Sequence, residues 1–178
     1  MELRKYSEKD YRYLKRLYEL SFPASERAPF RFVVRKAQQG KADFLTVYIK
    51  GRCCGMHYVV PYKDMVYCLY VAMDPRVRGR GIGTKLIQLG LSKYKGKRLL
   101  LSMEPLDPTA ENYEERLRRH HIYEKIGFHD LPNRVTEAGV VYALMGIGKD
   151  ITPREYRELL DYYMGPLRRI LTKMKMMD

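Results

Sequence analysis

The sequence predicts an α/β fold with a mixed sheet, an α+β arrangement in which antiparallel and parallel strand pairs are combined. Residues 42–49 and 53–61 read as strands around a Lys50-Gly51-Arg52 turn, which indicates an antiparallel hairpin. The apolar run 65–73 is followed by a glycine-rich turn, a helix and a second apolar run, 98–103. A strand, a crossover helix and another buried strand indicate parallel pairing.

The N-terminal region predicts a short strand and two helices. Residues 3–6 read as the strand, and Ser7 with Asp10 resembles an acidic capping box at the start of the first helix. Pro23 ends this helix. Its apolar stripe consists of Tyr11, Leu14, Leu17, Tyr18 and Phe22. A second helix is expected to run to about Gln39.

Length and composition indicate one soluble globular domain with a short appendage, since the chain has 178 residues, 46% hydrophobic and 31% charged. No apolar run approaches the ~18 residues of a membrane span. The first residues lack the apolar segment of a signal peptide, so we expect a cytoplasmic protein. Three cysteines and four histidines show no metal-ligand spacing. The sequence therefore predicts no metal site.

The net charge of +13 indicates an anionic ligand. Nucleic acid, an anionic membrane and a polyanionic small molecule are the alternatives. Basic residues are spread through the chain without a recognition motif, so the sequence predicts no specific nucleic acid.

The segment 71–86 reads as a strand end, a glycine-rich turn and the start of a helix. Three glycines fall within it: Gly79, Gly81 and Gly83. Backbone N–H groups can approach an anion closely here, and Arg78 and Arg80 add full positive charges. The spacing fits neither a Walker loop nor a dinucleotide fingerprint. The alternative is a tight strand-to-helix turn with solvated arginines.

The pattern Arg-x-x-Gly-x-Gly, met by Arg78, Gly81 and Gly83, resembles the acyl-CoA-binding motif of the GNAT superfamily of N-acetyltransferases. A second match closes the helix predicted from about Thr109 to Gly127. Its end, 122–128, is similar to the family's Phe-Tyr-x-x-x-Gly-Phe, with Ile in place of the first Phe.

One position departs from the family pattern. Where many members place a CoA-contacting Asn seven residues before Tyr123, this chain has Arg116. Asn112 returns to the same helix face, so either residue is a candidate for that contact. Two closing strands are expected at 128–136 and 140–145.

The resemblance covers residues 1–148 and implies a GNAT fold whose central strands, 65–73 and 98–103, splay apart around the pantetheine arm of CoA. It also implies the residues that contact acetyl-CoA. These are Val71, Met73, Arg78, Gly79, Arg80, Gly81, Ile82, Gly83 and Thr84. The backbone N–H of Met73 is expected to polarise the thioester carbonyl.

The implied activity is transfer of an acetyl group from acetyl-CoA to a primary amine of a small molecule or peptide in a ternary complex. Tyr123 is expected to protonate the leaving thiolate, Glu104 to act as general base and Glu26 to contact the amine. Five carboxylates are expected to form an acidic mouth for the amine: Glu104, Asp107, Glu111, Glu114 and Glu115. Glu104 and Asp107 lie before the helix and should escape pairing with helix arginines. A CoA-binding sensor without turnover and a basic nucleic-acid-binding protein are the alternative functions.

Residues 149–178 are expected to form a C-terminal helical extension. Thr152-Pro153-Arg154-Glu155 reads as a helix start, the helix should run to about Met164, and a basic amphipathic segment, 167–177, follows. Four alternative roles are open for this extension. It packs against the body, contacts a second subunit in a homodimer, covers the acceptor site or lies on a membrane surface.

Overall fold

The computed structural model describes residues 1–24, 26–77, 79, 81–137, 139–165 and 175–177. The chain folds into two compact units. Unit 1 comprises Met1–Pro61 and Cys68–Gly96, and unit 2 comprises Tyr62–Tyr67 and Lys97–Asp178.

Unit 1 begins with strand β1 (Glu2–Lys5), helix α1 (Tyr11–Ser21) and helix α2 (Phe30–Gln38), close to their predicted positions. The apolar stripe of α1 is confirmed for three residues that are buried: Leu14, Leu17 and Tyr18. The Tyr18 ring lies 5.3 Å from the ring of Phe30 and 4.9 Å from that of Tyr70, centroid to centroid. Aromatic packing therefore holds both helices on the sheet.

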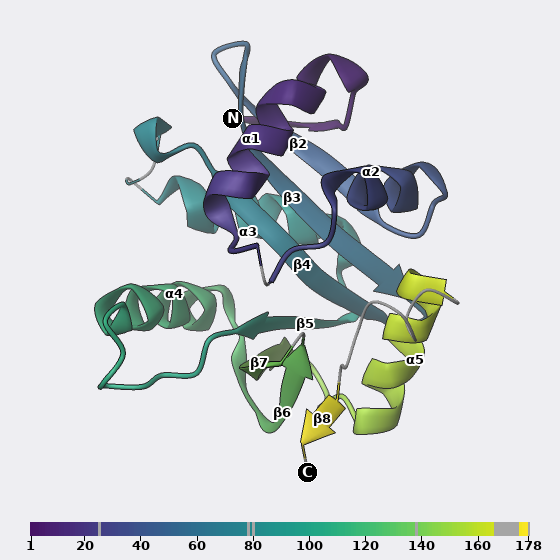
Figure 1. Ribbon diagram of the computed structural model, residues 1–178, viewed down its shortest axis with the longest axis vertical. Coiled ribbons are helices and arrows are strands. Elements are labelled where there is room, and N and C mark those ends of the chain that lie inside the picture. Colours follow the sequence, from purple (N-terminus) through teal and green to yellow (C-terminus); the bar gives the residue numbers. More distant parts are fainter. Residues whose placement is uncertain (25, 78, 80, 138, 166–174, 178) are drawn as a thin grey trace. The chain divides into compact units, whose positions relative to one another are not determined.

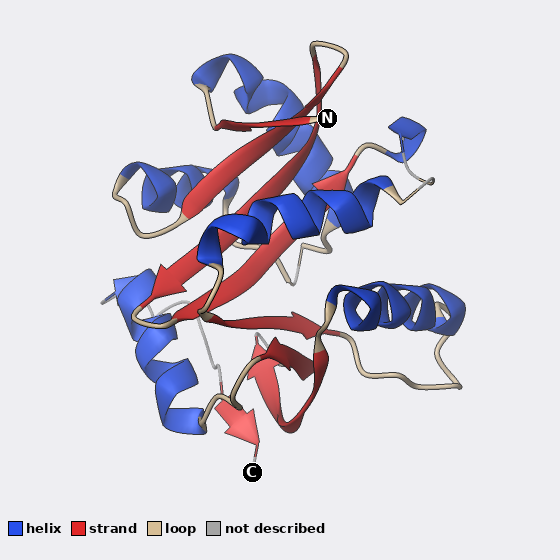
Figure 2. Cartoon of the chain, turned by 180° about the vertical axis from the view of Figure 1, so that it is seen from behind, coloured by secondary structure: helices blue, strands red, loops and turns tan. Residues whose placement is uncertain are grey.

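The meander of unit 1 follows the predicted order. Strand β2 (Asp43–Ile49) pairs antiparallel with β1 and with β3 (Arg52–Tyr62), and β4 (Met65–Met73) has the predicted bounds. Lys50 and Gly51 both have positive φ, 49° and 75°, as a two-residue hairpin turn requires. Helices α1 and α2 lie over one face of β2 and β3, and α3 (Ile82–Leu91) lies over the other (Figures 1 and 2).

The predicted capping box of Ser7 and Asp10 is wrong. In the described chain, neither side chain accepts a capping hydrogen bond at a helix start. Asp10 is buried, and its carboxylate accepts the hydroxyl of Tyr48 on β2 at 2.7 and 2.8 Å. The local pattern predicted that the Asp10 carboxylate accepts a backbone N–H at the helix start. It instead accepts the hydroxyl of Tyr48, which is distant in the sequence.

Helix α3 starts where the sequence predicts. It ends at Leu91 and is followed by a short 3-10 turn, η3 (Ser92–Tyr94). Leu89 on this helix is 40% exposed. The buried residues of the helix are Leu86, Ile87, Gly90 and Leu91. The Gly90 backbone lies directly against the ring of His57 on β3.

Unit 2 contains strand β5 (Arg98–Met103), helix α4 (Tyr113–Ile126), strand β6 (His129–Glu137) and strand β7 (Val140–Ile147). Strand β5 has the predicted bounds, and β7 pairs antiparallel with β5 and with β6. Helix α4 begins later than the predicted Thr109. The N–H and hydroxyl of Thr109 instead bind Oδ1 of Asp107 at 2.9 and 2.7 Å, a local turn that competes with the helix.

The C-terminal helix α5 (Pro153–Met164) is confirmed at both ends. Thr152 and Glu155 form the predicted capping box. Five residues bury its inner face: Tyr156, Leu159, Leu160, Tyr163 and Met164. Nη2 of Arg98 on β5 lies 2.6 Å from Oε1 of Glu155. These contacts support the alternative in which the extension packs against the body, within unit 2.

Residues Lys175–Met177 form strand β8, which pairs antiparallel with β6, where the sequence suggested a helix. The rest of that segment, 166–174, lies outside the described residues. Among the described residues the strands follow the hydrogen-bonding order β1-β2-β3-β4-β5-β7-β6-β8. The division at residue 148 stays a prediction.

Candidate active site

The glycine-rich loop joins β4 to α3 in unit 1. After a 3-10 turn, η2 (Pro75–Val77), Gly79 and Gly81 have φ of 93° and 72°, a conformation that other residues rarely adopt. The Gly79 carbonyl accepts the Ile82 N–H at 3.2 Å, and the Gly81 carbonyl accepts the Lys85 N–H at 3.0 Å. Glycine at 79 and 81 therefore shapes the turn that begins α3.

Gly83 lies in the first turn of α3. A Cβ placed on it would meet no described atom within 4 Å, and its φ is not in the left-handed region. Neither conformation nor packing within the described chain requires glycine here. The N–H groups of Gly83 and Thr84 belong to the first turn, whose donors lack acceptors inside a helix. The open surface and these donors fit a phosphate group.

The ends of the loop are fixed by one apolar cluster in unit 1. Its buried members are Val47, Cys54, Met73 and Leu86, and Val71, Val77 and Ile82 pack against it. Met73 precedes the loop and Ile82 follows it, so the same core anchors both ends. Arg78 and Arg80 lie outside the described residues, and their contact with a phosphate stays a prediction.

Asp74 shapes the turn that follows strand β4. Its Oδ1 accepts the N–H of Arg76 at 2.9 Å, and its carbonyl accepts the N–H of Val77 at 3.0 Å, which together form η2. The Arg76 guanidinium binds the same carboxylate and holds the pKa of Asp74 well below its usual range. The Asp-Pro pair was the available sequence signal for this turn.

Glu26 lies on the α1–α2 loop of unit 1 and is half-buried. The loop is pinned at Ala28, whose carbonyl accepts the Tyr18 hydroxyl at 3.0 Å and whose N–H donates to the Tyr70 hydroxyl at 3.3 Å. Arg27 donates to the carbonyl of Phe22 at 2.6 Å. Glu26 is therefore carried by a well-anchored loop, and its contact with an amine stays a prediction.

Tyr123 lies in the last turn of α4, in unit 2, and is half-buried. The helix ends as predicted at Gly127, with φ of 107°; the Gly127 N–H donates to the Glu124 carbonyl at 2.9 Å and the Phe128 N–H to the Tyr123 carbonyl at 3.0 Å. This is a Schellman motif. The Tyr123 and Phe128 rings pack edge to face at 6.0 Å. The motif fixes the backbone that carries the phenol.

Glu104 follows β5 in unit 2, and it does not escape the helix arginines. Its Oε1 accepts Nδ2 of Asn112 at 3.1 Å and lies 3.2 Å from Nη2 of Arg116, and its Oε2 is paired with Arg119. Arg116 also donates to the carbonyl of Pro105 at 2.9 Å. Glu104 thus holds the β5–α4 connection against the helix.

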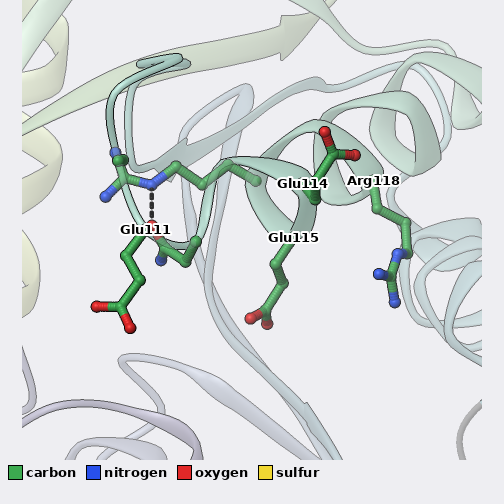
Figure 3. A pocket seen from close by; sticks show the side chains of 7 residues that line it. Glu111, Glu114, Glu115 and Arg118 are labelled. Carbon is green, nitrogen blue, oxygen red and sulfur yellow. Dashed lines mark hydrogen bonds between the residues drawn. The ribbon is translucent and has the colours of Figure 1, made fainter.

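A pocket of about 760 Å³ lies at the start of α4 (Figure 3). It is lined by Ala110, Glu111, Asn112, Glu114, Glu115, Arg116 and Arg118. Three carboxylates of the predicted acidic mouth are among these residues, together with two arginines, and Glu104 and Asp107 are not. The lining is therefore mixed in charge. Nε of Arg116 donates to Oδ1 of Asn112 at 2.7 Å, so the two candidates for the CoA contact bind each other.

The predicted site residues fall in both units. Unit 1 brings together the glycine loop, Val71 and Met73, and it carries Glu26, whereas unit 2 carries Glu104 and Tyr123. The assembly of these two sets into one site is a prediction. Within the described ranges, no three His, Cys, Asp or Glu side chains are grouped to hold a metal ion. No described helix is long and apolar enough to span a bilayer.

The family model of the acetyltransferase (GNAT) domain matches residues 40–130 of the chain. A comparison with curated proteins gives no match. Among solved structures, a protein from Bacteroides thetaiotaomicron assigned to the GNAT acetyltransferase family aligns with a TM-score of 0.73 and 17% identity, over 94% of this chain and 98% of that one.

Two further structures contain the donor or its product. An aminoglycoside 6'-N-acetyltransferase complexed with coenzyme A aligns with a TM-score of 0.62 and 14% identity, over 85% of this chain and 100% of that one. A Salmonella typhimurium protein determined with its cofactor acetyl-CoA aligns with a TM-score of 0.61 and 14% identity, over 86% of this chain and 97% of that one. At these identities the likeness shows the fold, and the predicted mixed α+β fold is confirmed.

The family model spans positions 40 to 130, which are 91 of the 178 residues. It therefore covers more than half of the chain, including the whole segment from the meander through the glycine loop to the end of α4. The chain belongs to the GNAT acetyltransferase family.

Proposed function

We propose that the protein is a cytosolic N-acetyltransferase that transfers an acetyl group from acetyl-CoA to a primary amine of a small molecule or peptide, by direct attack in a ternary complex. The open first turn of α3 carries this proposal, because Gly83 leaves a surface that no described atom fills. A phosphate there accepts the N–H groups of the turn. Two structurally similar proteins hold CoA or acetyl-CoA.

On the donor side, the loop from Gly79 to Thr84 binds the pyrophosphate through backbone N–H groups, and Arg78 and Arg80 offset its charge. Val71 contacts the pantetheine and acyl portion. The backbone N–H of Met73 donates to the thioester oxygen, where negative charge develops as the amine attacks. The roles of Val71 and Met73 are supported by their packing in the apolar cluster that anchors the loop.

Bound acetyl-CoA supplies an activated acyl group. The amine nitrogen forms a bond to the carbonyl carbon, the carbon–sulfur bond breaks, and the sulfur leaves as a thiolate. Tyr123 donates its phenol proton to the sulfur, since the reference pKa of a phenol, ~10, suits a thiolate leaving group. Glu104 takes the proton that the nitrogen loses. Glu26 contacts the amine and is the reserve candidate for the base.

Glu104 can act as the base only if its carboxylate can accept a proton. Arg116 and Arg119 both form charge-assisted bonds to the Glu104 carboxylate. The same bonds, with that of Asn112, occupy the lone pairs through which the carboxylate would accept a proton. Proton transfer to Glu104 therefore needs one of these bonds to open or a water molecule to relay the proton.

The test is release of free thiol from acetyl-CoA in the presence of amino acids, polyamines, aminoglycosides or peptides with free N-termini. Acetylated product is identified by mass spectrometry. Release that requires both a specific amine and Tyr123 supports the proposal. CoA binding without turnover on any amine would favour a sensor. Salt-sensitive binding of nucleic acid, unchanged by CoA, would favour a basic nucleic-acid-binding protein.

A further inference from the structure

The carboxylate of Asp74 joins helix α1 to the start of the glycine loop, within unit 1. Tyr13 on α1 donates its hydroxyl to Oδ2 of Asp74 at 2.8 Å. Arg76 donates Nη2 to the same oxygen at 2.6 Å and Nε to Oδ1 at 3.0 Å. The Asp74 side chain is 10% exposed and that of Arg76 is 82% exposed. The inner contact of the carboxylate is therefore with Tyr13.

Both groups are in the protonation states that this bond needs. The bonds from Arg76 keep the pKa of Asp74 low, so its carboxylate stays ionised at neutral pH. Burial, and then the bond to Asp74, raises the pKa of Tyr13 above that of a free phenol, so its hydroxyl keeps its proton. A hydroxyl donating to a carboxylate makes a charge-assisted hydrogen bond, stronger than one between neutral groups.

The glycines that follow Asp74 are the loop residues whose ordering costs the most backbone entropy. Gly79 and Gly81 have positive φ, and glycine loses more backbone freedom on ordering than any other residue. A loop that is ordered before binding loses less entropy on binding than one that the ligand must order. Asp74 fixes the first turn of the loop through Arg76 and Val77, and Tyr13 fixes Asp74.

We infer that Tyr13 and Asp74 are positioning residues that preorganise the glycine loop for acetyl-CoA. The inference rests on the proposed function, because it assigns the loop to that ligand. The pair acts on the affinity for the donor and not on the chemical step, since neither residue belongs to the predicted groups that touch the reacting atoms.

The test compares the parent with Tyr13→Phe, which deletes only the donating hydroxyl, and with Tyr11→Phe, the same change on the same helix. CoA affinity is measured by calorimetry, and kcat and KM for acetyl-CoA are measured with the most active amine. For Tyr13→Phe we expect the Kd for CoA and the KM for acetyl-CoA to rise about 3- to 10-fold while kcat is unchanged. A rise of this size corresponds to part of the free energy of a hydrogen bond to a charged group. Asp74→Asn, which keeps an acceptor oxygen, should lose less affinity than Asp74→Ala. Tyr11→Phe should behave as the parent.

Three outcomes would overturn the inference. Unchanged CoA affinity in folded Tyr13→Phe would show that the bond does not prepare the loop. A fall in kcat in step with the fraction of folded protein would show a merely structural role. If the folded parent itself binds no CoA, the proposed function fails along with the inference. If the parent binds CoA and Tyr13→Phe binds it equally well, only the inference fails.

Discussion

The imidazole ring of His57 on β3 lies directly against the backbone of Gly90 in α3. A Cβ at position 90 would come within 2.4 Å of Nδ1 and 2.5 Å of Cε1. His57 is completely buried, and in the described part of the chain neither ring nitrogen has a hydrogen-bond partner. The pair sets how closely α3, whose first turn is the candidate phosphate site, approaches the sheet.

Gly90→Ala should destabilise the protein. The added methyl group meets a fully buried ring, and overpacking of a core typically costs ~1–3 kcal/mol. Gly83→Ala is the matched control, because the same change in the same helix meets no described atom within 4 Å. Chemical denaturation measures both free energies of unfolding. Equal stability of the two variants would contradict the close packing at Gly90.

Stability should fall on mild acidification because of His57. Burial, and secondarily the charge of Lys93, lowers the pKa of His57 from 6.5 to about 4. Between these values the unfolded chain binds a proton that the folded chain does not, so stability is lost as the pH drops through this window. We expect His57→Leu to remove about 2 kcal/mol of the stability lost between pH 7.5 and pH 5. Denaturation of parent and variant at both pH values checks this, and identical losses would rule it out.

Tyr123→Phe should lower kcat and leave CoA affinity and stability nearly unchanged. The deleted hydroxyl is needed mainly as the thiolate departs, and a general acid is typically worth ~10²–10⁴-fold. Tyr113→Phe, at the first position of the same helix, is the control. Single-turnover rates with the most active amine measure the effect. If both variants react as fast as the parent, Tyr123 has a structural role.

Glu104→Gln should lower kcat for an amine while CoA affinity is retained, because it removes the candidate base. The change also weakens the bonds to Arg116 and Arg119, so activity and thermal unfolding are measured together. Arg119→Gln disturbs the same cluster without touching the carboxylate, and it should keep most of the activity. Equal losses in the two variants would assign Glu104 to holding the β5–α4 connection, and the search for a base would move to Glu26.

The sequence predicted elements whose ends are decided locally. Strands β4 and β5 have the predicted bounds because each is an apolar run with clear flanking residues, Asp74-Pro75 after β4 and Glu104-Pro105 after β5. Helix α5 has its predicted bounds because Thr152 and Glu155 pair across the first turn. The predicted capping box was wrong because Asp10 binds Tyr48, a partner distant in the sequence, rather than a helix end.

The candidate site was predictable to the same extent. The glycine loop depends on backbone conformation and short spacing, which one stretch of sequence displays. The bond between Tyr13 and Asp74 joins residues 61 positions apart, and no local pattern indicates it. Glu104 precedes α4 in the chain, yet the connection folds back and brings it to Arg116 and Arg119. Spacing alone could not show that return.

Gly83→Glu tests whether the first turn of α3 holds the phosphates of acetyl-CoA. Position 83 suits the test better than Gly81, whose φ of 72° would strain any other residue and confuse folding with binding. At Gly83 a side chain enters open space, so the fold should persist. The glutamate places bulk and negative charge where the phosphate should lie.

The measurement is calorimetric titration of CoA into the parent and Gly83→Glu at matched thermal stability, with Gly83→Ala as a smaller change. We expect saturable binding by the parent, weaker binding by Gly83→Ala and none by folded Gly83→Glu. Undiminished CoA affinity in folded Gly83→Glu would contradict this expectation.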